Sequence, residues 1–233
     1  MSAIDSKLLA YAQLMRLANV FTAVADPLAG WFAIGGGNPP SQLLLLVGAS
    51  ACLYTSGIVF NDCFDFAIDQ QERPNRPLPS GAIARSTAWT LAVTLMIVGL
   101  AFAALAGEFA AVIGVFLAVM ILFYNAWAKH ITALGPLTLG ACRFANFMLG
   151  MRCAPLRLWW MPATLGVYVA VLSFIARNEA TKPALRLIVK RMLLGIIVVD
   201  ALMVAGRGDW VGAALVLSLL VPAIVLGKFL AMT

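Results

Sequence analysis

Long apolar runs alternate with short polar breaks along most of the chain. A helix needs about 20 apolar residues to cross a hydrocarbon layer of roughly 30 Å, and the runs are close to that length. Glycine, proline and charged residues mark where the runs end. The pattern predicts eight membrane-spanning helices, at residues 8–34, 42–60, 86–106, 109–128, 134–151, 160–176, 191–206 and 209–230.

The composition favours the same class of protein. Hydrophobic residues make up 63% of the 233 residues, charged residues make up 11%, and the mean hydropathy is +0.96. A soluble domain of this size does not need so much apolar surface. The sequence also lacks the short alternating segments of an outer-membrane barrel. We therefore expect an all-α, polytopic transmembrane bundle that forms a single domain over residues 1–233.

The N-terminal segment and the cysteines narrow the class further. Residues 1–16 lack the basic region, apolar core and cleavage site of a secretory signal peptide, so we expect the first span to act as the insertion signal. No two cysteines form a C-x-x-C pair, and the single histidine, His130, leaves no set of ligands for a Cys/His zinc site. We expect small, buried, apolar roles for Cys52, Cys63, Cys142 and Cys153.

The distribution of basic residues predicts the orientation. With the N-terminus in the cytoplasm, twelve lysines and arginines fall on the inner side, and only Arg152, Arg157 and Arg207 fall on the outer side. This bias accounts for the net charge of +6 without nucleic-acid binding. We expect a multi-pass protein of the inner (cytoplasmic) membrane. The tryptophans would then form two interfacial belts, with Trp31, Trp159, Trp160 and Trp210 outside and Trp89 and Trp127 inside.

Four oxygen-bearing side chains follow the second run, in a chain that is poor in carboxylates. Asn61, Asp65 and Asp69 are spaced i, i+4, i+8, which places them on one helical stripe in steps of about 40°. Asp62 flanks the same face. Carboxylates this close together repel one another beside a membrane, and a divalent cation removes that repulsion. Oxygen ligands of this kind suit Mg²⁺, which prefers to share its shell with phosphate.

A stiff basic loop follows the acidic stripe. Residues 72–81 read E-R-P-N-R-P-L-P-S-G, and the prolines fix their backbone φ angles. Arg73 and Arg76 are thereby held near the carboxylates, and a planar guanidinium grips phosphate oxygens well. The alternative is a solvated, charge-balanced loop. The ordered spacing of acids and arginines favours a site for a diphosphate.

Other polar residues are expected at the same cytoplasmic face. Arg16 and Asn19 lie in the first span, residues 124–130 follow the fourth span, and residues 177–179 follow the sixth. Their convergence predicts a single site at this end of the bundle.

The order N-D-x-x-D-x-x-x-D, followed by R-P-x-R-P-x-P-S-G, resembles the first Asp-rich motif of the UbiA superfamily of intramembrane prenyltransferases. Arg16 and Asn19 are similar to the R-x-x-N of that family's first helix. Tyr124, Asn125 and Lys129 are similar to its residues after the fourth helix. The resemblance extends along most of the chain.

The resemblance implies a bundle, usually of nine transmembrane helices, around a central cavity that binds an isoprenoid diphosphate. Mg²⁺ on Asn61, Asp65 and Asp69 would help the diphosphate to leave as an allylic carbocation forms, and an acceptor, often aromatic, would attack C1. The isoprenoid tail would lie in an apolar cavity open to lipid. The implied catalytic residues are Asp62, Asp65 and Asp69. The candidate substrate-binding residues around them are Arg16, Asn19, Arg73, Arg76, Tyr124, Lys129 and Arg177.

Two features depart from the family pattern. The family carries a second Asp-rich motif after the sixth helix, where residues 176–180 read A-R-N-E-A. Three alternatives stay open: Asn178 and Glu179 bind a second Mg²⁺, one metal is used with Arg177 supplying part of its charge, or activity is reduced or lost. This pattern is similar to that of the EboC-like branch. The other departure is the count of eight spans, where nine are usual.

Several charged or polar residues lie inside the predicted spans. Arg143 and Asn146 are about 13–18 Å from the inner end of the fifth span, at 1.5 Å per residue, and a charge at that depth must face the bundle interior. Either both line the cavity and contact diphosphate or acceptor, or Arg143 is paired structurally, with Asp200 as the candidate partner. We expect Asp26 to cap the backbone around Pro27.

Other functions compete with prenyl transfer. A transporter or lipid-handling protein would use Arg143 and Asp200 as pathway charges, but it would leave the acidic stripe unexplained. A catalytically weak scaffold stays open because the second motif is altered. A CDP-alcohol phosphotransferase is set aside because its D-G-x-x-A-R opening is absent. The expected partners are therefore an isoprenoid diphosphate, a small acceptor and membrane lipid, with no nucleic acid.

Overall fold

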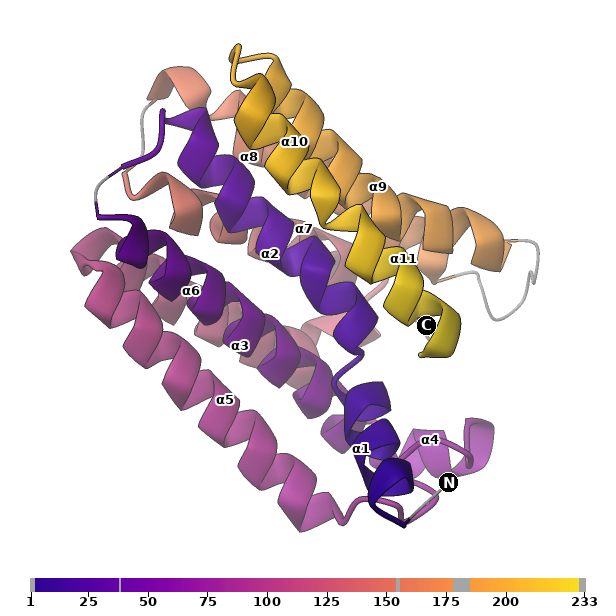
Figure 1. Ribbon diagram of the computed structural model, residues 1–233. Helices are drawn as coiled ribbons and strands as arrows, with labels where there is room; N and C mark the ends of the chain where they lie inside the picture. Colours follow the sequence, from indigo (N-terminus) through magenta and orange to yellow (C-terminus); the bar gives the residue numbers. More distant parts are fainter. Residues whose placement is uncertain (1–2, 38, 154–155, 178–184, 231–233) are drawn as a thin grey trace.

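The computed structural model describes residues 3–37, 39–153, 156–177 and 185–230, and within these ranges the chain is helical with short loops and no β-strand (Figure 1). The α-helices are α1 Ala3–Leu14, α2 Leu17–Ala33, α3 Pro40–Phe64, α4 Phe66–Glu72, α5 Arg85–Ala106, α6 Glu108–Ala126, α7 Leu134–Met151, α8 Trp160–Ala176, α9 Leu185–Ala205, α10 Trp210–Ser218 and α11 Leu220–Phe229. The 3₁₀ turn η1, Ala128–His130, comes before α7, and the 3₁₀ turn η2, Leu156–Leu158, comes before α8.

Helix α2 lies between the two halves of the bundle. On one side it packs against α3, which packs in turn along α5 and α6. On the other side it packs against α7 and α9, while α8 lies against both of these helices. The apolar core follows the same division, with one cluster centred on α3, α5 and α6 and a second on α2, α7, α8 and α9. Helices α10 and α11 complete the second half beside α2 and α9 (Figure 1).

The helices agree closely with the hydrophobic pattern. The expected spans at 134–151 and 160–176 coincide with α7 and α8, and those at 42–60, 86–106, 109–128 and 191–206 correspond to α3, α5, α6 and α9 with shifted ends. The first and last expected spans differ, because each is broken into two helices.

The first span breaks at Arg16. Helices α1 and α2 meet there at an angle of 42°. Arg16 has a φ of +45°, a left-handed conformation that is uncommon for a residue with a side chain. Its guanidinium reaches Asp62 of α3, with an N–O distance of 3.0 Å. The bend therefore places a cation of the first span against the acidic stripe of the second.

The last span breaks at Leu219, between α10 and α11. Pro222 lies three residues further on and has no N–H to donate to the carbonyl of Ser218, so the helical hydrogen-bond ladder is interrupted at that point. The residues before and after the break still form one apolar stretch, Trp210–Phe229, that is long enough to cross a membrane.

The described helices are those of an integral membrane protein. Four stretches are long and apolar enough to span a bilayer, or five when α1 and α2 are counted as one bent span. Helices α7 and α9 run beside them but carry Arg143 and Asp200. Large apolar side chains cover the outer faces of the bundle, among them Leu105, Val112 and Val167. An apolar surface of this kind is favourable in contact with lipid and unfavourable in contact with water.

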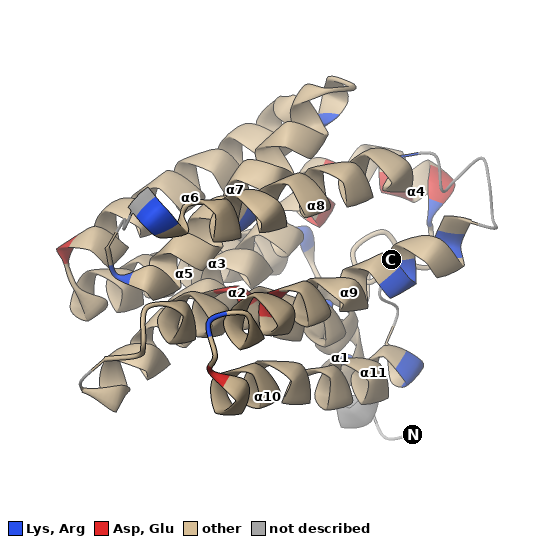
Figure 2. Cartoon of the chain, turned by 90° about the horizontal axis from the view of Figure 1, so that it is seen from above, with Lys and Arg blue, Asp and Glu red and all other residues tan. Residues whose placement is uncertain are grey.

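Charged residues gather at one end of the bundle. Figure 2 shows lysines and arginines at the start of α9 and the end of α11, at the end of the bundle that also carries the acidic residues of α4. The cations there include Arg186 and Lys190 of α9 and Lys228 of α11. Arg152, at the end of α7, and Arg207, which follows the end of α9, lie at the other end of these helices.

Helices α2 and α7 cross at close range because two glycines face each other's backbone. A Cβ atom on Gly30 would lie 2.2 Å from the carbonyl oxygen of Phe147, and one on Gly150 would lie 2.0 Å from that of Pro27. Both distances are impossible for real atoms, so any side chain at either position would push the helices apart. Small residues at such crossings let membrane helices pack through their backbones.

Two expectations about single residues were wrong. Trp31 does not belong to an interfacial belt, because it is buried at 5% exposure with the guanidinium of Arg152 stacked 4.7 Å from its ring. Cys153 is exposed, whereas Cys63 is buried and Cys52 and Cys142 are half-buried. All four thiols are free.

Candidate active site

A cavity of about 1330 Å³ extends into the bundle from the ends of α3, α4, α6 and α8. Every candidate site residue within the described ranges lines this cavity: Arg16, Asn19, Asn61, Asp62, Asp65, Asp69, Arg73, Arg76, Tyr124, Lys129, Arg143, Asn146 and Arg177. Asn178 and Glu179, the candidate ligands of a second metal, lie outside the described residues. The deeper walls are apolar and include Leu139 of α7, Leu172 of α8 and Ile196 of α9.

The acidic stripe keeps its helical register although α3 ends within it. Helix α3 ends at Phe64, and Asp65 joins it to α4. The Asp65 N–H donates to the carbonyl of Asn61 at 2.9 Å, and the Asp69 N–H donates to the carbonyl of Asp65 at 2.8 Å. Since these are i to i−4 hydrogen bonds, the three side chains stay on one face. The sequence therefore predicted the shape of the stripe correctly.

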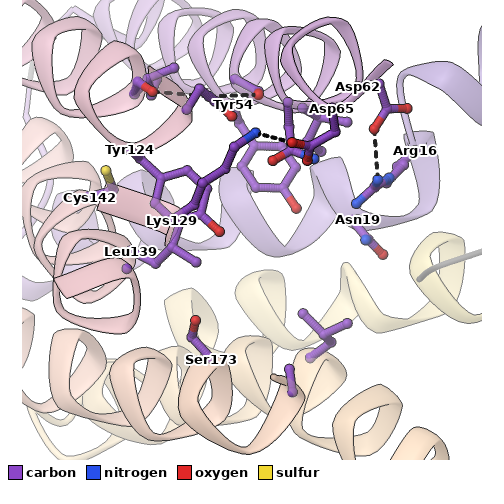
Figure 3. Close-up of a pocket in the computed structure, with 18 of the residues that line it drawn as sticks. Arg16, Asn19, Tyr54, Asp62, Asp65, Tyr124, Lys129, Leu139, Cys142 and Ser173 are labelled. Carbon is purple, nitrogen blue, oxygen red and sulfur yellow. Dashed lines mark hydrogen bonds and ion pairs between the residues drawn. The ribbon is translucent and has the colours of Figure 1, made fainter. Parts of the chain in front are cut away.

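Each carboxylate of the stripe is paired with a cation. Figure 3 shows two of these pairs, Arg16 with Asp62 and Lys129 with Asp65. Arg16 contacts Asp62 at 3.0 Å, and Lys129 contacts Asp65 at 2.5 Å. Arg76 lies between two acids, with its Nη1 2.7 Å from Asp69 and 3.6 Å from Asp62. These pairs offset the repulsion among three carboxylates of which Asp62 and Asp69 are almost fully buried.

The oxygen donors fit Mg²⁺ in kind. In the described part of the chain no three His, Cys, Asp or Glu side chains converge as a ready-made metal site. Mg²⁺ needs no such cage, because it is commonly held by one or two carboxylates together with phosphate oxygens and water. Asn61, Asp65 and Asp69 line one wall of the cavity and leave room for such a shared shell.

The basic loop after α4 is anchored by apolar side chains. Leu78 and Ile83 are buried in the core next to α3 and α5. The Ile83 N–H donates to the carbonyl of Pro77 at 3.1 Å, and the Ser80 N–H donates to that of Arg76 at 3.0 Å. This fixed backbone holds Arg76 between its two acids. Arg73 lines the cavity and makes no ion pair with any described residue, so its guanidinium is available to an anion.

Lys129 is supplied by η1, the turn between α6 and α7. Its ammonium lies between the carboxylate of Asp65 and the ring of Phe64, whose centroid is 5.7 Å away. Asn125, at the end of α6, donates to the carbonyls of Gly57 and Ile121 at 3.2 and 3.0 Å and so joins α6 to α3. Tyr124 beside it lines the cavity.

A polar wall lies deeper in the same cavity. Arg143 of α7 donates to both carboxylate oxygens of Asp26, at 3.2 and 3.1 Å, and to the carbonyl of Thr22 at 2.8 Å. Asn146 donates to Asp26 at 2.7 Å, and the ring of Tyr54 lies 5.0 Å from the Arg143 guanidinium. Arg143 thus lines the cavity and is also paired structurally, but the candidate partner Asp200 was wrong, because the close approach of α2 and α7 brings Asp26 to the guanidinium.

The role expected of Asp26 was also wrong. Pro27 has no N–H for the carbonyl of Ala23, and that carbonyl accepts instead from Ser50 Oγ at 2.9 Å and from Asn146 Nδ2 at 2.8 Å. Neighbouring helices thus satisfy the backbone around the proline, as is usual in membranes. Asp200 is fully buried near Asp26 and Arg143.

Tyr54 and Ser50, which lie at the polar wall, were not among the candidate residues predicted from the sequence. The signal was present, because Ser50, Tyr54, Gly57, Asn61 and Asp65 follow one another at spacings of four, three, four and four residues and all line the cavity. The acidic stripe is the end of a longer cavity-facing stripe of α3. Its upstream members carry no charge, which is why only their spacing marks them.

The chain is similar to several known proteins. The profile of the UbiA prenyltransferase family matches residues 19–232. A digeranylgeranylglyceryl phosphate synthase from Metallosphaera sedula is 30% identical over 141 residues, which are 60% of this chain and 50% of that protein. The synthase of the same name from Pyrococcus horikoshii is 33% identical over 148 residues, 60% of this chain and 51% of that protein. The chain thus matches about half the length of these curated relatives.

Solved structures share the fold at low sequence identity. A structure of digeranylgeranylglyceryl phosphate synthase in membranes superposes with a TM-score of 0.66 at 18% identity and covers 94% of both chains. A UbiA homologue from Archaeoglobus fulgidus, bound to GPP and Mg²⁺, gives a TM-score of 0.64 at 14% identity, over 94% of this chain and 87% of that one. The apo structure of a homologue from Aeropyrum pernix gives 0.62 at 18% identity, with 91% and 90% covered.

Proposed function

Because the chain belongs to the UbiA prenyltransferase family, we propose that it transfers an isoprenoid group from an isoprenoid diphosphate to a small acceptor inside the membrane. One observation carries the proposal: an acidic stripe interleaved with Arg16, Arg76 and Lys129 forms one end of a cavity whose deeper walls are largely apolar. An isoprenoid diphosphate has the matching division into a charged head and an apolar tail.

The diphosphate head would bind at the acidic end. Arg73 makes no ion pair with a described carboxylate, and Arg76 and Lys129 are close enough to turn from their carboxylates to phosphate oxygens. Mg²⁺ held by Asn61, Asp65 and Asp69 would supply a Lewis acid that stabilises the departing diphosphate. The homologue from Archaeoglobus fulgidus that is bound to GPP and Mg²⁺ supports this assignment.

The residues of this chain would act both as the diphosphate departs and as the acceptor attacks. Lys129 and Arg76 would balance the negative charge that develops on the leaving group. The tail would pack against Leu139, Leu172 and Ile196, which exclude water from the allylic cation. The acceptor would then be the nucleophile at hand, and the isoprenoid C1 would form its new bond to the acceptor instead of to water.

We assign the polar wall to the acceptor. Tyr54 precedes Asn61 by seven residues of α3, about 10 Å along the helix axis, so the wall lies beyond the diphosphate head in the same cavity. Arg143 is already balanced by Asp26, so the wall suits a neutral hydrogen-bonding group better than a second anion. The aromatic class of small acceptors, with phenol-type hydroxyls, meets that description.

The orientation is also part of the proposal. The end of the bundle with the site carries most of the basic residues, including those of α9 and α11 (Figure 2). By the positive-inside rule this end faces the cytoplasm. The charged diphosphate head would then enter the site from the cytoplasmic water.

Diphosphate release from membranes tests the proposal. Membranes with the wild-type chain should release diphosphate from geranyl, farnesyl or geranylgeranyl diphosphate only with Mg²⁺, and Asp65→Ala and Asp69→Ala should abolish this release. Glu108→Gln is the control, because Glu108 is an exposed carboxylate at the far end of α6. Equal release by wild type and Asp65→Ala would refute the proposal, and no release by wild type would favour a scaffold without catalysis.

A further inference from the structure

Arg177 stands where the family pattern places an acidic motif, and its contacts are with backbone carbonyls. Its Nη1 donates to the carbonyls of Ile131 and Thr132 at 3.0 and 3.1 Å, and its Nη2 donates to that of Lys129 at 3.3 Å. All three acceptors belong to η1 and the residues that join it to α7. The guanidinium therefore ties the end of α8 to the turn that carries Lys129.

Of the carbonyls that Arg177 contacts, that of Ile131 also accepts from the Gly135 N–H at 3.2 Å, and that of Thr132 cannot accept from residue 136, because Pro136 has no N–H. η1 ends at His130, and α7 begins at Leu134, so the carbonyls between them lie at the end of one helix and outside the next. Such carbonyls carry partial negative charge, and a cation placed on them is stabilising. Three donors from a planar fork also fix the direction of the turn, which a single hydrogen bond does not.

Gly135 makes room for this arrangement. A Cβ atom there would lie 3.1 Å from Arg177 Nη1, 3.3 Å from the carbonyl oxygen of Ala128 and 3.3 Å from the Cα of Lys129. A side chain at position 135 would thus press on the guanidinium and on the backbone of Lys129 at once. Gly135, which has no side chain, therefore leaves the space in which the Arg177 guanidinium binds η1.

We propose that Arg177 is a positioning residue that holds η1 so that the Lys129 ammonium lies against Asp65 at the acidic end. This use of Lys129 for the diphosphate rests on the proposed function, whereas the positioning itself does not. In this role Arg177 does not supply part of a missing metal charge, because its donors face protein carbonyls. Through Arg177, the end of α8 would then hold Lys129 in place beside the first acidic motif.

Chemical labelling without any ligand tests the positioning. Lys129 has 9% side-chain exposure and is paired with Asp65, so acetic anhydride should modify it slowly in the wild-type chain. Arg177→Gln should raise the labelling of Lys129, measured by mass spectrometry relative to the exposed Lys228 of the same chain. Arg157→Gln is the matched control, because Arg157 is exposed on η2 at the opposite end. Unchanged labelling of Lys129 in Arg177→Gln would overturn the proposal.

A second variant covers the case in which Arg177→Gln fails to fold. Gly135→Ala leaves Arg177 in place but crowds its Nη1, and it should also raise the labelling of Lys129 relative to Lys228. Thermal unfolding in detergent shows which variants are folded. A folded Gly135→Ala protein with wild-type labelling would count against the proposal as directly as the first result.

A double-mutant cycle tests how Arg177 acts on an anion. The probe is inorganic pyrophosphate with Mg²⁺, whose dissociation constant is measured for wild type, Arg177→Gln, Lys129→Gln and the double variant. Arg177→Gln should weaken binding about tenfold, as for the loss of a group that orients a ligand, and should have almost no effect once Lys129 is gone. Additive losses would mean that Arg177 contacts the anion directly. Failure of the wild type to bind pyrophosphate would sink the proposed function, while the labelling result would still decide the positioning.

Discussion

Arg143 and Asp26 form an ion pair inside the bundle, in which one guanidinium nitrogen lies within 3.2 Å of both carboxylate oxygens. Arg143 also lines the cavity, whereas Asp26 is fully buried between α2 and α7. The pair therefore fixes a charged side chain at the polar wall of the cavity. It links the packing of two helices to the chemistry of the cavity that they enclose.

Breaking this pair should destabilise the protein strongly. Asp26→Ala or Arg143→Ala leaves a buried charge without its partner, which typically costs about 3–5 kcal/mol. The double variant Asp26→Leu/Arg143→Met removes both charges and should be clearly more stable than either single variant. Thermal unfolding in detergent measures all three. A double variant less stable than both single variants would contradict the assignment of the pair.

The carbonyl that Pro27 leaves free gives a second prediction. Ser50→Ala removes one of the two side-chain donors to the Ala23 carbonyl and should cost about 1 kcal/mol. Pro27→Ala restores a backbone N–H for the same carbonyl, so Ser50→Ala should cost less in that background. Unfolding of the four proteins of this cycle in detergent provides the measurement. Thr90→Ala is a matched control, because the exposed Thr90 hydroxyl donates only to Ser86 of its own helix.

Metal affinity should rise when a cation is removed from the stripe. Lys129→Gln leaves Asp65 without its ammonium partner, so Mg²⁺ alone should bind more tightly than in the wild type and raise the melting temperature more at equal concentration. Diphosphate release should fall in the same variant, because Lys129 no longer balances the leaving group. Thermal shifts over a Mg²⁺ titration test the first half, with Lys228→Gln as the control. A smaller shift than in the wild type would show that Asp65 does not face the metal.

Arg76 should not tolerate replacement by lysine. Its Nη1 lies against both Asp69 and Asp62, which leaves the other nitrogens of the planar fork for phosphate oxygens, and a lysine ammonium is a point charge without these further donors. We expect Arg76→Lys to lower diphosphate release about tenfold or more, a typical loss for one orienting group. Arg157→Lys should have wild-type activity. If Arg76→Lys is also fully active, charge alone is sufficient at this position.

The sequence predicted the helices and the convergence of the polar residues on one cavity because both leave local signals. Apolar length marks the helices, and the four-residue spacing of Asn61, Asp65 and Asp69 marks the stripe whatever the rest of the chain does. The break before Pro222 was readable by the same rules, since proline interrupts a helical ladder. The bend at Arg16 was not, because its left-handed conformation is stabilised by a contact with Asp62 that is distant in sequence.

The partner of Arg143 could not be read from the sequence. Asp26 and Asp200 are both acids inside predicted spans, and spacing along the chain does not distinguish between them. The choice depends on how closely α2 and α7 approach, which Gly30 and Gly150 determine. The role of Arg177 was hidden for a similar reason, since its acceptors are backbone carbonyls some 45 residues away and any sequence supplies carbonyls.

Cys142 is half-buried on the cavity wall, while Cys153, eleven residues further along, is exposed at the opposite end of α7. The natural chain therefore carries its own pair of chemical reporters. A small thiol reagent that reacts at both positions should lose access only to Cys142 when the chamber is filled. Ratios of the two labels would then follow occupancy in native membranes, without any engineered residue or radioactive substrate.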